Sequence, residues 1–277
     1  MSPIEGRTMT DIRIGTSGYD YTDWKGTFYP QQVARKDFLA YYAQQFSTLE
    51  LNFSYYRMPE AAQLQRMAEA CGPDMDISIK AHQSLTHDID PPTWDDSVTL
   101  YRRAVEPLLR DGRLAAVLLQ FPYSFHYEPD NRRYLDKVLR ALGHLPLVVE
   151  FRNDQWLNNR VFDGLRARGA GFCCVDAPAL KGLPPSLDMV TADIAYVRFH
   201  GRNAKQWWGS DAAARFDYLY SPEELAGYDG RVQAMMQQAK KIRLYFNNHR
   251  RGQAPANALW LQEHLRSQQW FHDMEES

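Results

Sequence analysis

The sequence predicts a single α/β domain with the (β/α)8 arrangement of a TIM barrel. Eight short apolar runs with the character of β-strands alternate with longer stretches of helical periodicity. Divided among eight units, the 277 residues give about 35 per unit, enough for a strand, a helix and two short loops. Eight parallel strands can close on themselves, which removes both exposed edges of the sheet. An open doubly wound sheet is the rival, but the first strand ends in Gly15-Thr16-Ser17-Gly18, without the GxGxxG spacing of a phosphate-binding turn.

Composition and charge narrow the class of protein. The chain has 44% hydrophobic and 24% charged residues and a net charge of −2, which is typical of a globular domain and excludes disorder over the whole chain. No apolar run approaches the roughly 20 residues that span a bilayer, so no membrane partner is expected. Residues 1–11 lack the apolar stretch of a secretory signal, and three cysteines are an odd number for a disulfide framework. We therefore expect a cytoplasmic location.

The expected strands follow one another at regular intervals. They are residues 12–15, 48–52, 76–80, 116–120, 147–151, 172–176, 195–200 and 242–247. Apolar residues at three-to-four spacing predict helices around residues 38–46, 64–68, 135–142 and 225–236, with a closing helix near 258–265. We expect one barrel domain over residues 12–270, a flexible leader over 1–11 and a tail over 271–277. The two long connections, 16–37 and 201–222, are expected to serve as lids or binding loops.

Every predicted strand ends near a polar or charged residue. In a barrel these carboxyl ends meet at one mouth, where the chemistry of TIM-barrel enzymes takes place. Four of these side chains can transfer protons or act as electrophiles, and they are the candidate catalytic residues: Glu150, Asp176, His200 and Lys80. Glu150 or Asp176 would be the general base, and His200 or Lys80 the acid or electrophile. Because such charges are costly to bury alone, we expect some of them to pair.

Other polar residues near the strand ends would bind or orient a substrate. Arginine guanidinium groups clamp phosphate and carboxylate groups through paired hydrogen bonds. The candidate substrate-binding residues are Arg152, Arg198, Asn52, Gln120, Asn247, Asn248, Tyr19 and Thr16. The basic turn at residues 249–251 follows the last strand, where barrels often bind phosphate, and would add to this anion site.

Metal binding is an alternative use of the same residues. Glu150, Asp176 and His200 end three consecutive strands, and two carboxylates with an imidazole suit Zn²⁺ or Mn²⁺. Arg152 and Arg198 would lie beside such an ion and repel it. We therefore expect no metal and no other cofactor.

Aromatic residues are concentrated in the expected loops. They make up 13% of the chain, and groups of them follow the first, second and seventh strands, including Trp24, Tyr56 and Trp208. Such loops could roof the mouth and stack on a base or sugar, or they could pack on themselves and cover the core. The sequence leaves both alternatives open.

Six strings of residues occur in and after the expected strands. They are Ile14-Gly15-Thr16-Ser17-Gly18-Tyr19, Glu50-Leu51-Asn52-Phe53-Ser54-Tyr55-Tyr56, Leu119-Gln120-Phe121-Pro122, Val149-Glu150-Phe151-Arg152, Val197-Arg198-Phe199-His200-Gly201 and Tyr245-Phe246-Asn247-Asn248-His249. With these strings the chain resembles the YecE-like family, the domain of unknown function 72, in family order over nearly its whole length. The resemblance implies a TIM-barrel fold but no particular activity. His249 stands where an acidic residue is common in the family, which weakens a metal or base role at that position.

These observations lead to hypotheses of different classes. The first is an enzyme, of hydrolase, lyase or isomerase type, that acts on a small phosphate- or carboxylate-bearing substrate at the mouth of the barrel. The second is a protein that binds a nucleotide or nucleic acid without catalysis, with aromatic loops on the bases and arginines on the phosphates. The third is a metal-dependent phosphoesterase, related to endonucleases in shape, that uses Glu150, Asp176 and His200.

Overall fold

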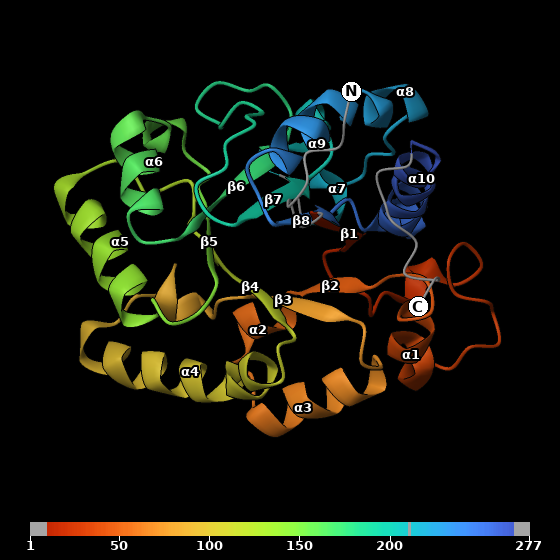
Figure 1. Cartoon of the computed structure of the whole chain (residues 1–277), viewed down its shortest axis with the longest axis horizontal. Helices are drawn as coiled ribbons and strands as arrows, with labels where there is room; N and C mark the ends of the chain where they lie inside the picture. The colour runs from red at the N-terminus through yellow and green to blue at the C-terminus, as the bar shows by residue number, and fades with distance from the viewer. Residues whose placement is uncertain (1–9, 210–211, 269–277) are drawn as a thin grey trace, which may run out of the picture.

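A computed structural model describes residues 10–209 and 212–268 and contains eight parallel strands. The strands are β1 (Asp11–Thr16), β2 (Thr48–Leu51), β3 (Asp76–Lys80), β4 (Leu114–Gln120), β5 (Leu147–Glu150), β6 (Gly171–Asp176), β7 (Ile194–Phe199) and β8 (Lys241–Phe246). Their order in the sheet is β1-β8-β7-β6-β5-β4-β3-β2. The two ends of this order meet at a parallel bridge between Ser17 and Glu50, so the sheet forms a nearly closed barrel (Figure 1). The predicted TIM-barrel fold is confirmed.

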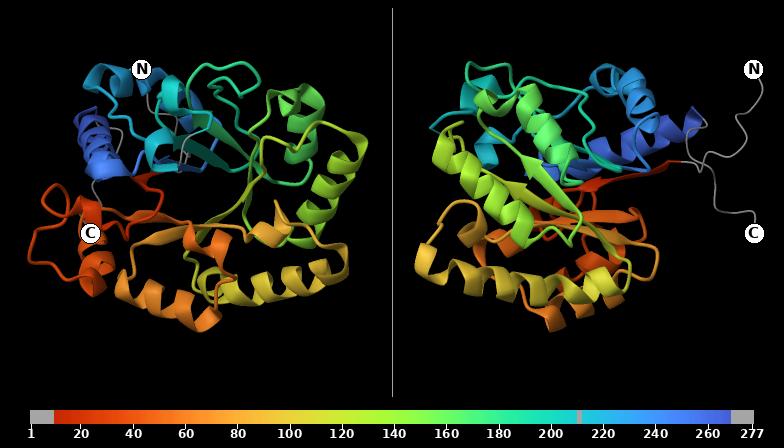
Figure 2. Two further views of the ribbon diagram at one scale, coloured as in Figure 1. Left: turned by 180° about the vertical axis from the view of Figure 1, so that it is seen from behind. Right: turned by 60° about the vertical axis from the view of Figure 1, so that its left-hand side comes forward.

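Helices surround the barrel, as Figures 1 and 2 show. They are α1 (Phe38–Tyr42), α2 (Phe53–Tyr56), α3 (Ala61–Ala70), α4 (Trp94–Arg110), α5 (Pro129–Ala141), α6 (Asn159–Arg166), α7 (Ala212–Arg215), α8 (Pro222–Ala226), α9 (Asp229–Met236) and α10 (Gln253–Ser267). The connection between β6 and β7 contains no helix. Across the described ranges, every helix is too short or too polar to cross a membrane.

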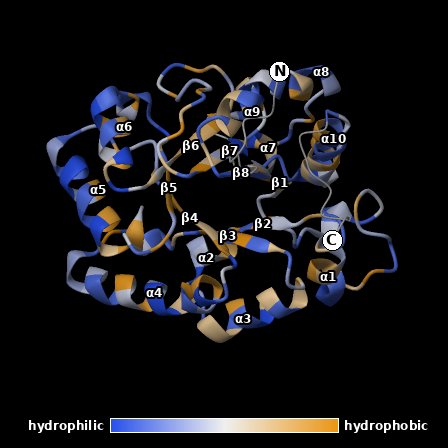
Figure 3. Cartoon of the chain, in the orientation of Figure 1, coloured by the Kyte–Doolittle hydropathy of each residue, from blue (hydrophilic) through white to orange (hydrophobic). Residues whose placement is uncertain are grey.

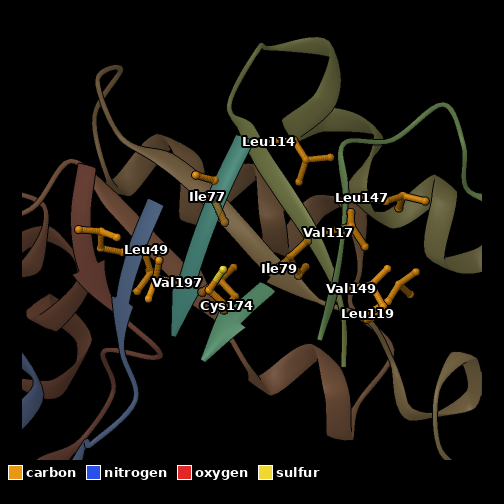
Figure 4. Packing of buried hydrophobic residues seen from close by; sticks show 14 of the residues in the cluster. Leu49, Ile77, Ile79, Leu114, Val117, Leu119, Leu147, Val149, Cys174 and Val197 are labelled. Atoms are coloured by element: carbon orange, nitrogen blue, oxygen red, sulfur yellow. The ribbon is translucent and has the colours of Figure 1, made fainter. Parts of the chain in front are cut away.

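Side-chain alternation along the strands separates two cores. On one face of each strand, apolar side chains point toward the helices. Among them are Leu49, Ile77, Val117, Val149 and Val197 (Figure 4). The other face points into the barrel, which is filled by a second cluster that includes Ala116, Leu118, Val148, Cys173, Tyr196 and Tyr245. Figure 3 shows the resulting pattern, with hydrophobic strands inside and hydrophilic outer faces on the helices.

The end of the barrel opposite the mouth is closed by a buried arginine. Arg243 of β8 has no exposed surface, and its Nε donates to Asp76 Oδ2 of β3 at 2.9 Å. Its Nη1 donates to the main-chain oxygen of Asp11 in β1 at 2.9 Å, and Thr48 of β2 donates to Asp76 Oδ1 at 2.6 Å. Four strands are therefore tied together at this end. The strand ends predicted to bind a ligand lie at the opposite end of the barrel.

The structure corrects several expected boundaries. Asp11 already belongs to β1, whereas the remainder of the expected leader, except Thr10, and the tail at 271–277 lie outside the described residues. Asn52 is not a strand residue but precedes α2. The expected helix over 225–236 is two helices, because α8 ends at Ala226 and α9 begins at Asp229.

Candidate functional site

The carboxyl ends of the strands surround a cleft of about 570 Å³ at the mouth of the barrel. Six of the twelve candidate residues from the sequence line it, namely Asn52, Lys80, Gln120, Arg152, Arg198 and Asn247. They come from the ends of six different strands, so the closed barrel brings together residues that are up to 195 positions apart in the chain. Glu150 and His200 lie beneath this cleft, and the other four candidates lie elsewhere.

The walls of the cleft carry positive charge. Lys80, Arg152, Arg198 and Arg215 line it, and no aspartate or glutamate of residues 10–209 and 212–268 is among the lining residues. The nearest carboxylates, Glu50 and Glu150, have no exposed surface and lie under the floor. Four cationic side chains against two buried carboxylates leave an excess of positive charge, which attracts anions.

Arg198 forms the floor by joining the two buried carboxylates. Its Nη1 donates to Glu150 Oε2 at 2.7 Å, and its Nη2 donates to Glu50 Oε1 at 2.7 Å and to Ser17 Oγ at 2.9 Å. Tyr196 donates to the other oxygen of Glu50 at 2.6 Å. Burial lowers the pKa of Arg198, but Glu50 and Glu150 raise it by more, so Arg198 stays charged. The floor is thus a fixed ion-pair network, and only Nε of Arg198 has no hydrogen-bond partner among the described residues.

Glu150 is surrounded by two arginines and a histidine. Besides Arg198, Nε of Arg152 lies 2.5 Å from Glu150 Oε1, and His200 Nε2 lies 3.2 Å from the same oxygen. Burial raises the pKa of Glu150, but Arg152, Arg198 and His200 outweigh it and hold the pKa well below its usual value. A general base works best with a pKa near the working pH. The arrangement therefore favours Glu150 as the anchor of the arginines over Glu150 as the base.

His200 is completely buried and engaged on both ring nitrogens. Asn247 Nδ2 donates to Nδ1 at 3.0 Å, so Nε2 carries the proton and donates to Glu150. Burial and the neighbouring Arg152 lower the pKa of His200 to about 3, which keeps the imidazole neutral. His200 does not line the cleft. The expected role as general acid is therefore not supported, and the side chain instead orients Asn247 and Glu150.

Asp176 does not face the mouth. Phe172 and Cys174 of β6 point toward the helices. Side chains alternate along a strand, so Asp176, two residues after Cys174, points to the same outer face. There it accepts hydrogen bonds from Arg202 at 2.7 and 2.9 Å, from Tyr220 at 2.7 Å and from Tyr228 at 2.6 Å. The expectation that Asp176 is a catalytic base at the mouth is thus corrected.

The same displacement removes the alternative metal site. Because Asp176 points away from Glu150 and His200, the three do not converge. No group of three or more His, Cys, Asp or Glu side chains suited to a metal ion occurs within residues 10–209 and 212–268. Arg152 and Arg198 occupy the positions next to Glu150 that an ion would need.

Lys80 differs from Arg152 and Arg198 because no carboxylate pairs with it in the described part of the chain. Its Nζ donates to Gln120 Oε1 at 2.8 Å and lies 3.9 Å from the centre of the Tyr55 ring. Burial lowers the pKa of Lys80 to about 7, with a further lowering by Arg198. Lys80 is therefore present as both amine and ammonium at neutral pH, which suits a group that exchanges protons or attacks a substrate.

Arg152 and Asn52 present unused polar atoms to the cleft. Arg152 is 15% exposed and reaches Glu150 only through Nε, and its terminal nitrogens make no hydrogen bond with the described residues. Asn52 donates to Ser17 Oγ at 2.6 Å, and its buried Oδ1 has no partner in the same part of the structure. These atoms are available to hold a ligand.

Three candidate binding residues lie outside the cleft. Thr16 has no exposed surface and faces α1, where it contacts the hydroxyl of Tyr42 at 3.1 Å. Tyr19 lines a neighbouring hollow above α2 and α3. Asn248 is buried and donates to the main-chain oxygen of Tyr218 and to Asn257, which fixes the loop before α10. Thr16 points outward because of the side-chain alternation along β1, whereas Tyr19 and Asn248 lie in loops beyond the strand ends.

The basic turn at residues 249–251 does not form the expected anion site. Arg250 pairs with Asp217 at 2.6 Å, and the main-chain nitrogen of Arg251 donates to Asp23 at 2.7 Å. Only His249 of this turn lines the cleft.

The aromatic side chains of the loops fall into two groups, one packed into the core and one exposed at the cleft. Trp24 and Tyr29 pack into the core with Phe38, where the rings of Tyr29 and Phe38 stack at 3.9 Å. Three others line the mouth and are exposed: Tyr56 at 75%, Tyr123 at 40% and Trp208 at 52%. Exposed large aromatics at a cleft are suited to stacking on a planar group.

Comparisons with known proteins agree with the architecture. The profile of one family, described as "Protein of unknown function DUF72", matches residues 13–276. The chain is 27% identical to the UPF0759 protein YunF of Bacillus subtilis (strain 168) over 269 residues, which cover 92% of this chain and 94% of YunF. It is similar to the crystal structure of a DUF72 family protein from Thermotoga maritima MSB8, with a TM-score of 0.85, 36% identity and coverage of 92% of this chain and 99% of that one. A DUF72 family protein from Enterococcus faecalis V583 has a TM-score of 0.82 at 26% identity, with coverage of 92% and 95%.

Proposed function

The chain belongs to the DUF72 family, as its strand-end motifs predict, and we propose that it is an enzyme acting on a small phosphate- or carboxylate-bearing substrate at the mouth of the barrel. The observation that carries this proposal is the charge of the cleft, where the described lining residues include Lys80, Arg152, Arg198 and Arg215 and no carboxylate. Its volume of about 570 Å³ is in the range of small-molecule sites.

In this proposal the cationic residues have different tasks. Arg152 binds the anion, because its terminal nitrogens make no hydrogen bond with the described residues, and Arg215 adds positive charge nearby. Arg198 supports the floor, since both of its terminal nitrogens are occupied by Glu50 and Glu150. Lys80 is the group that exchanges a proton with the substrate, because its pKa of about 7 makes both forms available. Asn52, Gln120 and Asn247 orient the substrate.

Binding of simple anions to matched variants tests the proposal. Calorimetric titration with inorganic phosphate and with acetate at low ionic strength should detect binding to the wild type. Arg152→Met should weaken it by at least about tenfold, the effect of losing one charge-assisted hydrogen bond. Arg250→Met, which removes an arginine paired outside the cleft, should change the affinity by less than about twofold. If neither anion binds, or if both variants lose affinity equally, the proposal fails.

The exposed aromatic rim favours a second candidate, a protein that binds a nucleotide or nucleic acid without catalysis. Tyr56, Tyr123 and Trp208 could stack on bases while arginines contact phosphates. Titration with single-stranded and duplex oligonucleotides at about 50 and 200 mM salt should then show affinity that falls with salt, and no product. Absence of binding at the lower salt concentration would remove this candidate.

A further inference from the structure

Lys80 lies at the end of β3 with its amino group directed into the cleft of cations. An ammonium group has three N–H donors, and the described protein offers one acceptor, Gln120 Oε1, at 2.8 Å. Gln120 is held in this orientation because its own Nε2 donates to the main-chain oxygen of Phe121 at 2.9 Å. The Tyr55 ring covers a second side of the amino group at 3.9 Å. The nitrogen is thus positioned by two contacts and is not committed to an ion pair.

The surroundings of Lys80 disfavour a permanent positive charge. Glu50 and Glu150, carboxylates that the described residues place beneath the cleft, are already bound to Arg198 and have no exposed surface. Arg152 and Arg198 are cations that line the same cleft. Burial next to other cations is one of the conditions under which a lysine becomes a nucleophile at neutral pH. The pKa of Lys80, lowered to about 7 by burial and by Arg198, agrees with this geometry.

We propose that Lys80 forms a Schiff base with an aldehyde or ketone group of the anionic substrate. The proposal rests on the proposed function, because Arg152 would hold the phosphate or carboxylate of the same molecule. It narrows the substrate class to small anions that carry a carbonyl group, and it gives Lys80 the role of a catalytic residue that bonds to the substrate.

The covalent step balances without an oxidant or reductant. The lone pair of the Lys80 amine attacks the carbonyl carbon, a C–N bond forms, and the π electrons of the C=O bond move to oxygen. A proton passes from nitrogen to that oxygen and gives a carbinolamine. Protonation of its hydroxyl group breaks the C–O bond, releases one water molecule and leaves a protonated imine. The anionic group of the substrate offsets the positive charge of the imine beside Arg152.

Reductive trapping with pyridoxal 5′-phosphate tests this inference, because the probe combines an aldehyde with a phosphate. The wild-type protein is incubated with limiting probe at pH 7, reduced with borohydride and mapped by peptide mass spectrometry. Lys80 should be labelled at least about tenfold more than Lys137. Lys137 is a matched control, since its Nζ also lies over an aromatic ring, that of Trp94 at 3.7 Å, but on the outer helix α5. The labelling rate should rise with pH around a midpoint near 7.

Variants and competition separate this inference from the proposed function. Lys80→Arg places a permanent positive charge at this position, so phosphate should bind at least as tightly as to the wild type, while the label at position 80 is lost. Lys137→Met should leave labelling of Lys80 unchanged. Excess inorganic phosphate should protect Lys80, and pyridoxal without its phosphate should react at least about tenfold more slowly.

Two results would overturn the inference. If phosphate binds by calorimetry but Lys80 is not labelled above Lys137, the Schiff base is excluded and the anion site stands. If Lys80 is labelled equally by pyridoxal and is not protected by phosphate, the anionic substrate class is excluded together with the proposed function.

Discussion

Asp176 shows how one residue can look catalytic in the sequence and be structural in the fold. It follows an apolar strand, as Glu150 does, but its side chain leaves the barrel on the helix side. Arg202 binds both of its oxygens, and the hydroxyl groups of Tyr220 and Tyr228 bind one oxygen each. Burial raises the pKa of Asp176, but the bonds from Arg202, Tyr228 and Tyr220 lower it by more, so that the pKa is below its usual value. The carboxylate therefore ties β6 to the loop after β7 and to α9.

Asp176→Asn should separate this structural role from a role in the site. The substitution removes a buried charge that faces four donor atoms, so the free energy of unfolding in urea should fall by about 3–5 kcal/mol. Phosphate affinity of the folded variant should stay within about twofold of the wild type. Asp193→Asn is the control, because the Asp193–Lys240 pair is exposed and should contribute less than about 1 kcal/mol. If the Asp176→Asn variant is as stable as the wild type but no longer binds phosphate, Asp176 has a role in ligand binding.

Strand alternation explains which site residues the sequence could identify. Lys80, Gln120 and Arg198 are at strand ends with inward parity, so their place in the cleft could be predicted once the barrel was assumed. Glu50 has the same parity and was visible as a polar strand end, but its pairing with Arg198 depends on closure of the barrel. Arg215 comes from a loop helix after β7, and no periodicity in the sequence indicates that it reaches the mouth.

At the scale of elements, the seam between β1 and β2 is the weakest part of the barrel. The pairing there is one bridge, Ser17 with Glu50, together with a hydrogen bond from Gly18 N to Glu50 O at 2.8 Å. The Tyr42 hydroxyl from α1 fills the gap, since it accepts from Thr16 N at 2.8 Å and donates to Thr48 O at 3.1 Å. The two strands can come this close only because Gly15 has no side chain.

Gly15→Ala should open this seam. A Cβ at this position would lie 2.3 Å from Thr48 O and 2.9 Å from the Tyr42 hydroxyl, and neither the strand backbone nor the buried ring can move away easily. We expect a loss of about 1–3 kcal/mol in the free energy of unfolding. Gly230→Ala in α9 is the matched control, because a Cβ there meets nothing within 4 Å. It should stabilise the protein by about 0.5–1 kcal/mol through the helix propensity of alanine. Equal effects of the two substitutions in urea unfolding would show that the seam tolerates a side chain.

The order of the elements and the bounds of the strands followed from periodicity, but the ends of the helices did not. All eight strands were predicted within one or two residues, because each is a buried apolar run between polar segments. The division between α8 and α9 depends on tertiary contacts, since Tyr228 lies between them and its hydroxyl reaches Asp176. The capping box formed by Ser221 and Glu224 fixes the start of α8, which the spacing of apolar residues alone could not locate.

At the scale of the whole molecule, the barrel interior contains buried charged groups at both of its ends. Arg243 and Asp76 occupy its closed end, and Glu50, Glu150 and Arg198 occupy the end below the cleft. Between them lie tyrosines and small residues such as Ser78, whose hydroxyl is 3.0 Å from that of Tyr245. Neutralising one of these charged side chains would leave its buried partner unpaired. The stability of the fold therefore depends on the protonation states of the buried side chains.

Acid should therefore destabilise the protein, and His200 offers a way to measure one part of the effect. Its pKa is about 3 in the folded protein, through burial and Arg152, and about 6.5 in an unfolded chain. Between these values the unfolded state binds the additional proton, so the contribution of His200 is complete above about pH 6.5 and is lost as the pH falls toward 3. Glu150 acts in the same direction, because its folded pKa is also lowered.

Between pH 7.5 and pH 5, His200 alone should account for a loss of about 2 kcal/mol in the free energy of unfolding. His200→Gln keeps a donor for Glu150 without a titrating ring, so its free energy of unfolding in urea should fall by about 2 kcal/mol less than that of the wild type over this interval. If the two proteins lose the same amount, His200 is protonated in the folded state, and the neutral imidazole that links Asn247 to Glu150 has to be abandoned.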